Sequence, residues 1–215
     1  MNKGKISNAV ISRLPRYYRF LGRLLRDNVT RISSKELAEL MQVTASQIRQ
    51  DLNCFGGFGQ QGYGYNVELL HHEIGEILGL GNKTPVILIG AGNLGKVVAN
   101  QLDLQTRGFQ LVAAFDRSPS TIGQPLIGLT IRDIAELEQV CAQLSPKAAI
   151  ICVPTAAAAE LADKLVGLGI VGFWNFSSYD FTYHHEQVKV VNVHLSDSIM
   201  TLSYLVSHLD DAEEK

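Results

Sequence analysis

The residues most able to carry chemistry are three glycines spaced G-x-G-x-x-G, directly after the apolar run Val86–Ile89. In such a turn Gly90 permits a tight bend out of a strand, and Gly92 lets the backbone approach a pyrophosphate with no Cβ in the way. The helix that follows can pack close to the sheet at Gly95, with its free N–H groups and positive dipole end toward the phosphates. The pattern predicts a dinucleotide-binding turn, formed by Gly90, Ala91, Gly92, Asn93, Leu94 and Gly95.

An acidic residue stands where such a site needs one. A second apolar run, Phe109–Phe115, ends at Asp116, which lies 21 residues after Gly95; the expected offset is about 20 residues. A carboxylate there accepts a hydrogen bond from the ribose 2′-hydroxyl and repels a 2′-phosphate, which favours NAD(H) over NADP(H). Arg117, next to it, is the residue type that accommodates a 2′-phosphate and so argues the other way. The alternative is a structural glycine turn that binds no ligand.

The remaining residues of the second half do not suggest catalysis. No acid/base constellation is found, no segment remains for a substrate domain, and a lone histidine is more often structural or at the surface. We therefore predict no catalytic residue, and an NAD-dependent oxidoreductase is the alternative. His71, His72 and Glu73 are consecutive, so on a helix they point in different directions; they are read as surface residues, and no metal site is predicted.

Composition indicates a soluble cytoplasmic protein. The chain has 215 residues, of which 46% are hydrophobic and 19% charged, the usual range for a globular protein. Neither an apolar run of about 18 residues nor a signal-peptide core is present, so we expect no membrane span and no secretion. Three cysteines without a C-x-x-C pair fit free thiols in a reducing compartment.

Charge is distributed unevenly along the chain. Residues 1–65 hold ten Lys or Arg against four Asp or Glu, a net charge of +6, whereas residues 66–215 hold nine against seventeen, a net charge of −8. A basic amino-terminal module on an acidic body predicts a polyanionic partner for the first module alone.

Two capping boxes inside the basic module predict a helix-turn-helix. Ser33-Ser34-Lys35-Glu36 begins a helix that runs to about Met41, and Thr44-Ala45-Ser46-Gln47 begins another that runs to about Asn53. In this motif the second helix enters the major groove. Ile48 and Leu52 would be buried, which leaves Arg49 to read guanine and glutamines to read adenine. Asp51 is expected to pair with an arginine or to support the helix.

The flanking segments complete a winged helix. A glycine- and aromatic-rich segment, 55–65, predicts a β-hairpin wing, and a helix over 11–27 precedes the motif, with Pro15 tolerable only in its first turn. A helix over 67–80 follows, with Leu69 and Ile77 among its inward residues. The predicted DNA-binding residues are Arg13, Arg16, Ser33, Ser34, Lys35, Thr44, Ser46, Gln47, Arg49, Gln50, Gln60, Gln61 and Tyr63.

We predict an α/β chain in three parts. Residues 1–80 form the winged-helix DNA-binding domain, and residues 85–195 form a Rossmann-like doubly wound parallel sheet that binds NAD(H). Here a helix over 93–106 follows the glycine turn, and 121–131 is a loop with a short extended piece. Residues 196–215 hold an amphipathic helix and the tail; Ile199, Leu202, Leu205, Val206 and Leu209 share a face. This helix either docks on its own domain or reaches a second subunit.

The whole set of motifs resembles the bacterial redox-sensing repressor family Rex. The matching stretches are Arg13–Arg19, Arg31–Leu37, Gln47–Leu52, Phe55-Gly56, Gly62–Val67, Gly90–Gly95, Ala114–Asp116 and Val153-Pro154. The resemblance implies a homodimer on a palindromic operator, released by NADH with NAD⁺ competing, and a carboxy-terminal helix exchanged between subunits. It also implies nicotinamide-side contacts at Val153, Pro154, Asn175 and Phe176.

Several positions depart from the family pattern. The family usually has a basic residue at Gln50, Arg or Lys among Gln60-Gln61, and Tyr at Cys54. Neutral residues at the wing tip are expected to flatten the salt dependence of DNA binding. At the family's switch positions Arg19 is retained, but Gln101 and His194 replace the usual Tyr and Asp. A family member whose redox response is altered or lost is therefore a further alternative.

Overall fold

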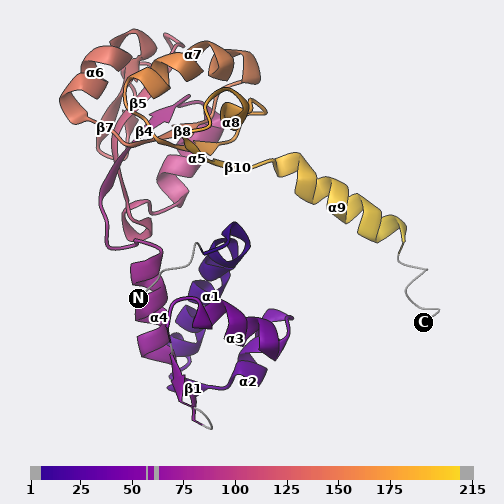
Figure 1. Cartoon of the computed structure of the whole chain (residues 1–215). Coiled ribbons are helices and arrows are strands. Elements are labelled where there is room, and N and C mark those ends of the chain that lie inside the picture. The colour runs from indigo at the N-terminus through magenta and orange to yellow at the C-terminus, as the bar shows by residue number, and fades with distance from the viewer. Residues whose placement is uncertain (1–5, 57, 61–62, 209–215) are drawn as a thin grey trace. The chain divides into compact units, whose positions relative to one another are not determined.

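The computed structural model describes residues 6–56, 58–60 and 63–208 (Figure 1). The chain divides into two compact units, Met1–Gly81 and Asn82–Lys215, which are described separately.

Helix α1 opens the first unit and begins earlier than predicted. It spans Asn8–Arg26, and its N-cap is Ser7, whose Oγ accepts a hydrogen bond from the backbone N–H of Val10. Pro15 therefore lies inside the helix and not in its first turn, which corrects the sequence prediction. Pro15 has no N–H to donate to the Ile11 carbonyl, but both residues are exposed, so water can satisfy that carbonyl.

The helix-turn-helix consists of α2, Ser34–Met41, and α3, Ala45–Asn53. The first capping box is complete, since Ser33 and Glu36 each accept a hydrogen bond from the other's backbone N–H. In the second box Thr44 accepts from the Gln47 backbone, but the Gln47 side chain donates to Asp51 instead of returning to Thr44. Between the helices Gln42 adopts a left-handed conformation with φ of 53°.

A small antiparallel sheet and α4 complete the first unit. The strands β1 (Arg31–Ile32), β3 (Gly64–Asn66) and β2 (Gly59–Gln60) lie in that order, and α4 spans Val67–Ile77. The α4 residues that enter the core are Val67, Leu70 and Ile74. Leu69 and Ile77, predicted to face inward, are exposed, because they lie outside the buried stripe that 67, 70 and 74 form at helical spacing.

His71 also departs from the sequence prediction. Its ring stacks on Tyr18 of α1 with centroids 4.0 Å apart, so it is half-buried and not a surface residue. Burial, with a smaller effect of His72, lowers the His71 pKa below its usual value.

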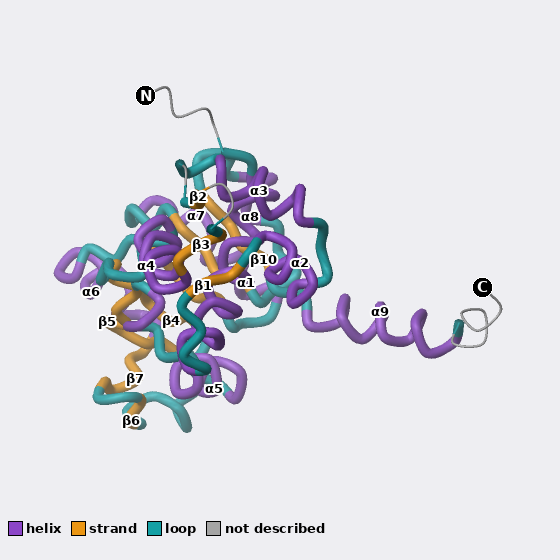
Figure 2. Tube along the Cα trace, turned by 90° about the horizontal axis from the view of Figure 1, so that it is seen from below, coloured by secondary structure: helices purple, strands orange, loops and turns teal. Residues whose placement is uncertain are grey.

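The second unit is built on a seven-stranded sheet with the order β10-β9-β8-β4-β5-β7-β6. Figure 2 labels β4, β5, β7 and β6 of this sheet. All neighbouring pairs are parallel except β6 and β7. The strands are β4 (Thr84–Ile89), β5 (Phe109–Asp116), β6 (Pro125–Leu126), β7 (Leu129–Asp133), β8 (Ala148–Ile151), β9 (Gly172–Asn175) and β10 (Lys189–Asn192). The chain adds strands on one side of β4 and then on the other, which confirms the predicted doubly wound fold.

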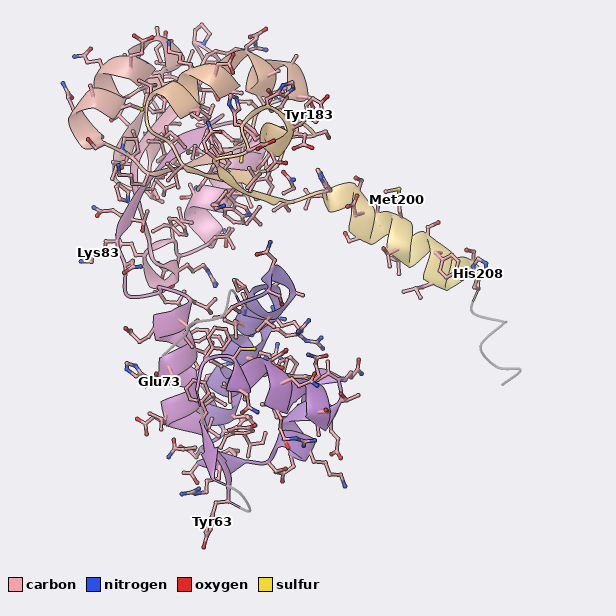
Figure 3. All side chains as sticks on the ribbon, viewed as in Figure 1. Tyr63, Glu73, Lys83, Tyr183, Met200 and His208 are labelled. Carbon is pink, nitrogen blue, oxygen red and sulfur yellow. The ribbon has the colours of Figure 1, made fainter. Side chains whose placement is uncertain are left out.

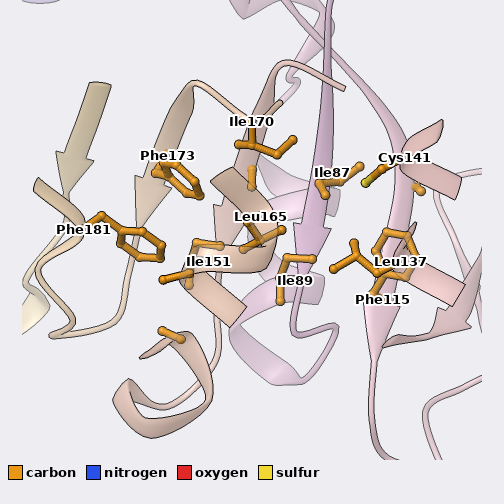
Figure 4. Packing of buried hydrophobic residues seen from close by; sticks show 14 of the residues in the cluster. Ile87, Ile89, Phe115, Leu137, Cys141, Ile151, Leu165, Ile170, Phe173 and Phe181 are labelled. Atoms are coloured by element: carbon orange, nitrogen blue, oxygen red, sulfur yellow. The ribbon is translucent and has the colours of Figure 1, made fainter. Parts of the chain in front are cut away.

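Helices cover both faces of this sheet. Helix α5 (Asn93–Gln101) packs on the face of Val86 and Leu88, whereas α6 (Leu137–Leu144) and α7 (Thr155–Gly167) pack on the face of Ile87 and Ile89. On the second face Phe173 stacks on Phe181 with ring centroids 4.4 Å apart (Figure 4). Phe181 begins the short helix α8, Phe181–His184, whose N-cap is Asp180.

Two segments of this unit differ from the prediction. Helix α5 ends at Gln101 and not near residue 106, because Leu102 leaves helical geometry and the chain turns to bury Leu104 before a 3₁₀ turn at Gln105–Arg107. The segment 121–131, predicted as a loop with a short extended piece, contains two extended pieces, β6 and most of β7, and β7 pairs with β5 from Ala114 to Asp116. Only Ile131 of β7 is buried, which explains its weak apolar signal.

Helix α9, Leu195–Ser207, leaves its whole surface exposed, with its apolar residues between 51 and 63% accessible. Figure 3 labels Met200 on this helix and His208 just beyond it. Leu209, predicted to share the apolar face, lies outside the described residues. No helix within the described part of the chain is both long and apolar enough to span a membrane.

Candidate nucleotide site and nucleic-acid interface

The glycine turn connects β4 to α5 and excludes side chains at two of its three glycines. Gly90 has φ of 92°, and a Cβ there would lie 2.5 Å from the Cys152 carbonyl oxygen and 2.7 Å from Val153 Cγ1. A Cβ on Gly95 would lie 2.0 Å from the Gly90 carbonyl oxygen. Gly90 therefore makes the bend, and Gly95 lets α5 begin directly against it.

Gly92 has a different environment. A Cβ on Gly92 would meet no atom of the described residues within 4 Å, and its φ of −71° is open to any residue. Gly92 is the N-cap of α5, and among the described residues no side chain caps this helix end. The first N–H groups of α5 therefore have no capping side chain among the described residues, and only a ligand brought against the backbone would require glycine here.

This turn lies where the winding of the sheet reverses, between β4 and β8. Ligands of open α/β sheets bind at such a switch point, outside the carboxyl ends of the strands. Gly90–Gly95 follow β4, Val153 and Pro154 follow β8, and Phe176 follows β9. The described geometry thus brings the predicted cofactor residues of three strands to one edge of the sheet.

Asp116 ends β5 on the other side of β4. Its Oδ1 accepts a hydrogen bond of 2.9 Å from the backbone N–H of Ser118, which holds the carboxylate in place. Asp116 is half-buried and Arg117 is exposed. This arrangement suits a carboxylate that receives a ribose hydroxyl.

Asn175 is the exception among the predicted cofactor residues. It is fully buried, and its amide is occupied by hydrogen bonds to the protein itself. The sequence indicated a ligand contact, whereas the structure gives Asn175 the geometry of a positioning residue.

The cavity found in this unit lies away from the glycine turn. It measures about 470 Å³ and is lined by the middle of β5, by β7 and by the loop before it. None of the predicted cofactor residues lines it.

In the first unit a buried ion pair holds the recognition helix. The Arg13 guanidinium donates from Nε and Nη2 to the two oxygens of Asp51, each at 2.7 Å. Tyr17 Oη and Gln47 Nε2 donate to the same carboxylate at 2.9 and 2.8 Å. Burial alone would raise the Asp51 pKa, but these hydrogen bonds outweigh it and hold that pKa below its usual value.

This cluster changes the reading of two predicted DNA contacts. Arg13 and Gln47 are already bound to Asp51 in the described structure. Arg13 fixes α3 against α1, whereas Gln47, four residues before Asp51 on α3 itself, orients the carboxylate. The expected arginine partner of Asp51 is thereby identified as Arg13.

Arg49 remains directed at the exterior. It is exposed on α3, and its Nη1 donates to Ser34 Oγ of α2 at 3.1 Å, a contact that orients the guanidinium across the two helices. Thr44, Ser46 and Gln50 are exposed on the same helix-turn-helix, as is Lys35. Arg16 donates to the Met41 carbonyl at the end of α2 and lies 5.8 Å from the centre of the Phe20 ring.

The wing adds one residue that sequence reasoning missed. Arg31 of β1 is exposed and donates from Nη1 to the Tyr63 carbonyl at 3.3 Å, beside the highly exposed Tyr63 side chain (Figure 3). The basic residue type was visible in the sequence, but its place beside the hairpin depends on the pairing of β1 with β3. The Gln60 side chain and Gln61 lie outside what the structure describes.

The three predicted switch residues are all exposed. Arg19 lies on α1 in the first unit, Gln101 ends α5, and His194 is the N-cap of α9. The thiol of Cys152 is half-buried beside the glycine turn. Burial raises its pKa to about 12, which suits a packing role and not a reactive one.

The chain is similar to known proteins over nearly its full length. A family model described as "Putative DNA-binding protein N-terminus" matches residues 5–53, and one described as "CoA binding domain" matches residues 81–179. The chain is 51% identical over 205 residues to the redox-sensing transcriptional repressor Rex of Clostridium botulinum strain Alaska E43, covering 95% of this chain and 97% of that one. The protein of strain Eklund 17B is 50% identical with the same coverage.

Solved structures are similar to the same extent. The crystal structure of RSP with β-NAD⁺ and operator DNA is 46% identical, with a TM-score of 0.88 and coverage of 98% of this chain and 97% of that one. RSP with β-NADH is 43% identical, with a TM-score of 0.89 and coverage of 98% and 99%.

Proposed function

The chain belongs to the Rex family of redox-sensing transcriptional repressors, and we propose that it binds a palindromic operator, senses the NADH/NAD⁺ ratio and is released from DNA by NADH. The observation that carries this proposal is the presence of two sites in one chain: an outward-facing recognition helix and a glycine turn at the switch point of a doubly wound sheet. Proteins of this family are repressors and not enzymes, so the dinucleotide acts as a signal.

The fit of the residues to NAD(H) supports the ligand. Gly92 and the uncapped start of α5 would receive the pyrophosphate, and Asp116 would accept from the adenosine ribose. The nicotinamide half would then lie toward β8 and β9, near Val153, Pro154 and Phe176. RSP, which is similar over the full chain, has been crystallised with both β-NAD⁺ and β-NADH. The bound dinucleotide supplies the redox signal; the protein binds and orients it.

The DNA-binding surface is proposed on the first unit. Arg49 would reach base edges from α3, while Arg16, Arg31, Lys35 and Tyr63 would meet the phosphate backbone around it. A palindromic operator requires two copies of this surface. The protein is proposed to act in the cytoplasm, where its free cysteines would stay reduced.

A gel-shift titration tests the function directly. The DNA is a duplex that the protein itself selects from a library of randomised palindromes, and NADH, NAD⁺ and NADPH are added separately. We expect NADH to release the DNA at lower concentration than NADPH, and NAD⁺ to oppose NADH. DNA binding indifferent to all three would refute redox sensing; NADH consumption on addition of a carbonyl substrate would favour an oxidoreductase.

Replacing Arg49 with alanine is expected to remove sequence-specific DNA binding. A bidentate contact to one base contributes about 1–3 kcal/mol of discrimination, and two copies would lose it together. Fluorescence anisotropy on the selected duplex and on a scrambled one measures the change. Arg107→Ala removes the same charge from the second unit and should leave the ratio of the two affinities intact. Equal affinity of wild type and Arg49→Ala for the selected duplex would exclude Arg49 as the base reader.

Replacing Asp116 with alanine is expected to weaken NADH binding. A hydrogen bond to a charged group contributes about 1.5–3 kcal/mol, and the loss should be smaller for NADPH, whose 2′-phosphate the carboxylate repels. Energy transfer from Trp174, the single tryptophan, to bound NADH gives the affinity. Asp133→Ala, at the end of the neighbouring strand β7, is the control. Unchanged NADH affinity in Asp116→Ala would contradict the ribose role.

A homodimer formed through α9 is proposed from its exposed apolar residues. Patches of this kind mark protein–protein interfaces, and a second copy is the partner that a palindrome requires. Leu202→Glu should therefore dissociate the dimer, because a buried unpaired carboxylate costs several kcal/mol. Sedimentation equilibrium measures the mass, and Ser207→Glu, with the same charge off the Ile199 and Leu202 face, is the control. A monomeric wild type, or a Leu202→Glu dimer as strong as wild type, would contradict this interface.

A further inference from the structure

The side chain of Asn175, the last residue of β9, is buried with no exposed surface. Its Nδ2 donates to the Tyr179 carbonyl and to Asn192 Oδ1, both at 2.8 Å. Its Oδ1 accepts from the Ser177 backbone N–H at 3.0 Å and from Ser177 Oγ at 2.6 Å. These four bonds use both donors and both lone pairs of the amide.

The main chain fixes the orientation of this amide. The Ser177 N–H can only donate and the Tyr179 carbonyl can only accept, so Oδ1 must face Ser177 and Nδ2 must face Tyr179. Asn192 must consequently present its oxygen to the second Nδ2 hydrogen. A buried amide with a missing partner is unfavourable, so these bonds hold together the end of β9, the loop over 177–179 and the end of β10.

One of these segments leads to α9. Asn192 is the last residue of β10, and the next residue, Val193, donates its backbone N–H to the Asn175 carbonyl at 2.8 Å. Helix α9 begins two residues later, at Leu195. Asn175 thus holds the start of α9 by a side-chain bond on one side and a main-chain bond on the other.

The other segment is the loop at the nucleotide edge. The Phe176 N–H donates to the Ile151 carbonyl of β8, and the Cys152 N–H donates to the Ile89 carbonyl of β4, just before Gly90. The residue after each of β8, β9 and β10 is therefore joined by a main-chain hydrogen bond to the last residue of the neighbouring strand, from β4 to β10. Because Asp116 marks the adenosine side on β5, the nicotinamide half of a dinucleotide extends toward this β8–β9 side.

We propose that the Asn175–Asn192 hydrogen bond is the link that transmits occupancy of the nicotinamide side to the start of α9. Asn175 and Asn192 are positioning residues, and neither contacts the ligand. A ligand that moves the Phe176–Tyr179 loop changes the hydrogen bonds of Asn175. Through these bonds it changes the direction in which α9 leaves the end of β10. This inference rests on the proposed NADH-dependent release from DNA.

The test measures coupling separately from binding. The coupling ratio is the Kd for the selected duplex with saturating NADH divided by the Kd without it. Asn192→Leu keeps the size of the side chain but has no acceptor for Asn175, Asn192→Asp restores an acceptor, and Lys189→Ala changes an exposed residue of the same strand. NADH affinity is followed by energy transfer from Trp174, and stability by thermal unfolding.

We expect Asn192→Leu to bind NADH and DNA separately as wild type does, while its coupling ratio falls toward one from the usual range of about 5- to 150-fold. Asn192→Asp and Lys189→Ala should keep the wild-type ratio. A residue with only a structural role would shift thermal unfolding and leave the ratio unchanged. A wild-type ratio in Asn192→Leu overturns the link and leaves the proposed function standing. A wild-type protein with a ratio of one overturns both.

Discussion

Replacing Gly95 with alanine is expected to abolish NADH binding and to destabilise the second unit. The new Cβ would lie 2.0 Å from the Gly90 carbonyl oxygen, a backbone atom that cannot move without opening the turn. Overpacking of this kind costs about 1–3 kcal/mol and at times more, and contact with rigid backbone places Gly95→Ala at the upper end. Thermal unfolding and Trp174-to-NADH energy transfer measure the two losses.

Gly92→Ala is the matched control within the same turn. Its Cβ meets no described atom within 4 Å, so stability should be unchanged. A pyrophosphate held against the backbone would nevertheless be displaced, and we expect at least about a tenfold weaker NADH affinity, or 1.4 kcal/mol. A stable Gly92→Ala variant that binds NADH normally would show that no ligand approaches this turn, and a stable Gly95→Ala variant would contradict the packing described.

The second large effect is expected from Asp51→Ala. Removing one partner of a buried ion pair costs about 3–5 kcal/mol. Arg13 is one-third exposed and keeps some solvation, so we expect about 3 kcal/mol, with operator affinity falling as α3 loses its hold on α1. Chemical denaturation and anisotropy measure both. Glu36→Ala, which removes an exposed capping carboxylate of α2, should destabilise the protein far less, because its partners remain solvated. Equal losses in the two variants would contradict the role assigned to Asp51.

The pH dependence of the same cluster has a defined sign. The folded-state pKa of Asp51 is depressed, so its contribution is complete above the unfolded value of about 3.9 and is lost as pH falls through the folded-state value. The stability advantage of wild type over Asp51→Asn should therefore be constant near neutrality and shrink below about pH 4. An advantage that stays constant into strong acid would contradict the ionised state of Asp51.

Features that depend on residues close together in the chain could be predicted from the sequence. The glycine spacing after an apolar run specified the β4–α5 turn, and the Ser33–Glu36 capping box specified the start of α2, because both depend on residues close in the chain. The alternation of strands and helices likewise predicted a doubly wound sheet, which the similar repressor structures confirm.

Features that depend on tertiary pairing could not be predicted. The Gln47 side chain had a local partner in its capping box, but Asp51, already held by Arg13 and Tyr17, is the stronger acceptor. β7 has a single buried residue and forms a strand because β5 offers it an edge. Asn175 has the residue type of a ligand contact, and only the positions of Ser177, Tyr179 and Asn192 show that its amide is already used.

The proposed function is the conversion of the NADH/NAD⁺ ratio into DNA occupancy. The most direct measurement is fluorescence anisotropy of the selected duplex at constant total dinucleotide, with the NADH fraction raised in steps. We predict that the duplex stays bound in NAD⁺ and is released as the NADH fraction rises, and that Gly92→Ala remains bound throughout. Occupancy that does not change with the NADH fraction in the wild-type protein would contradict the account.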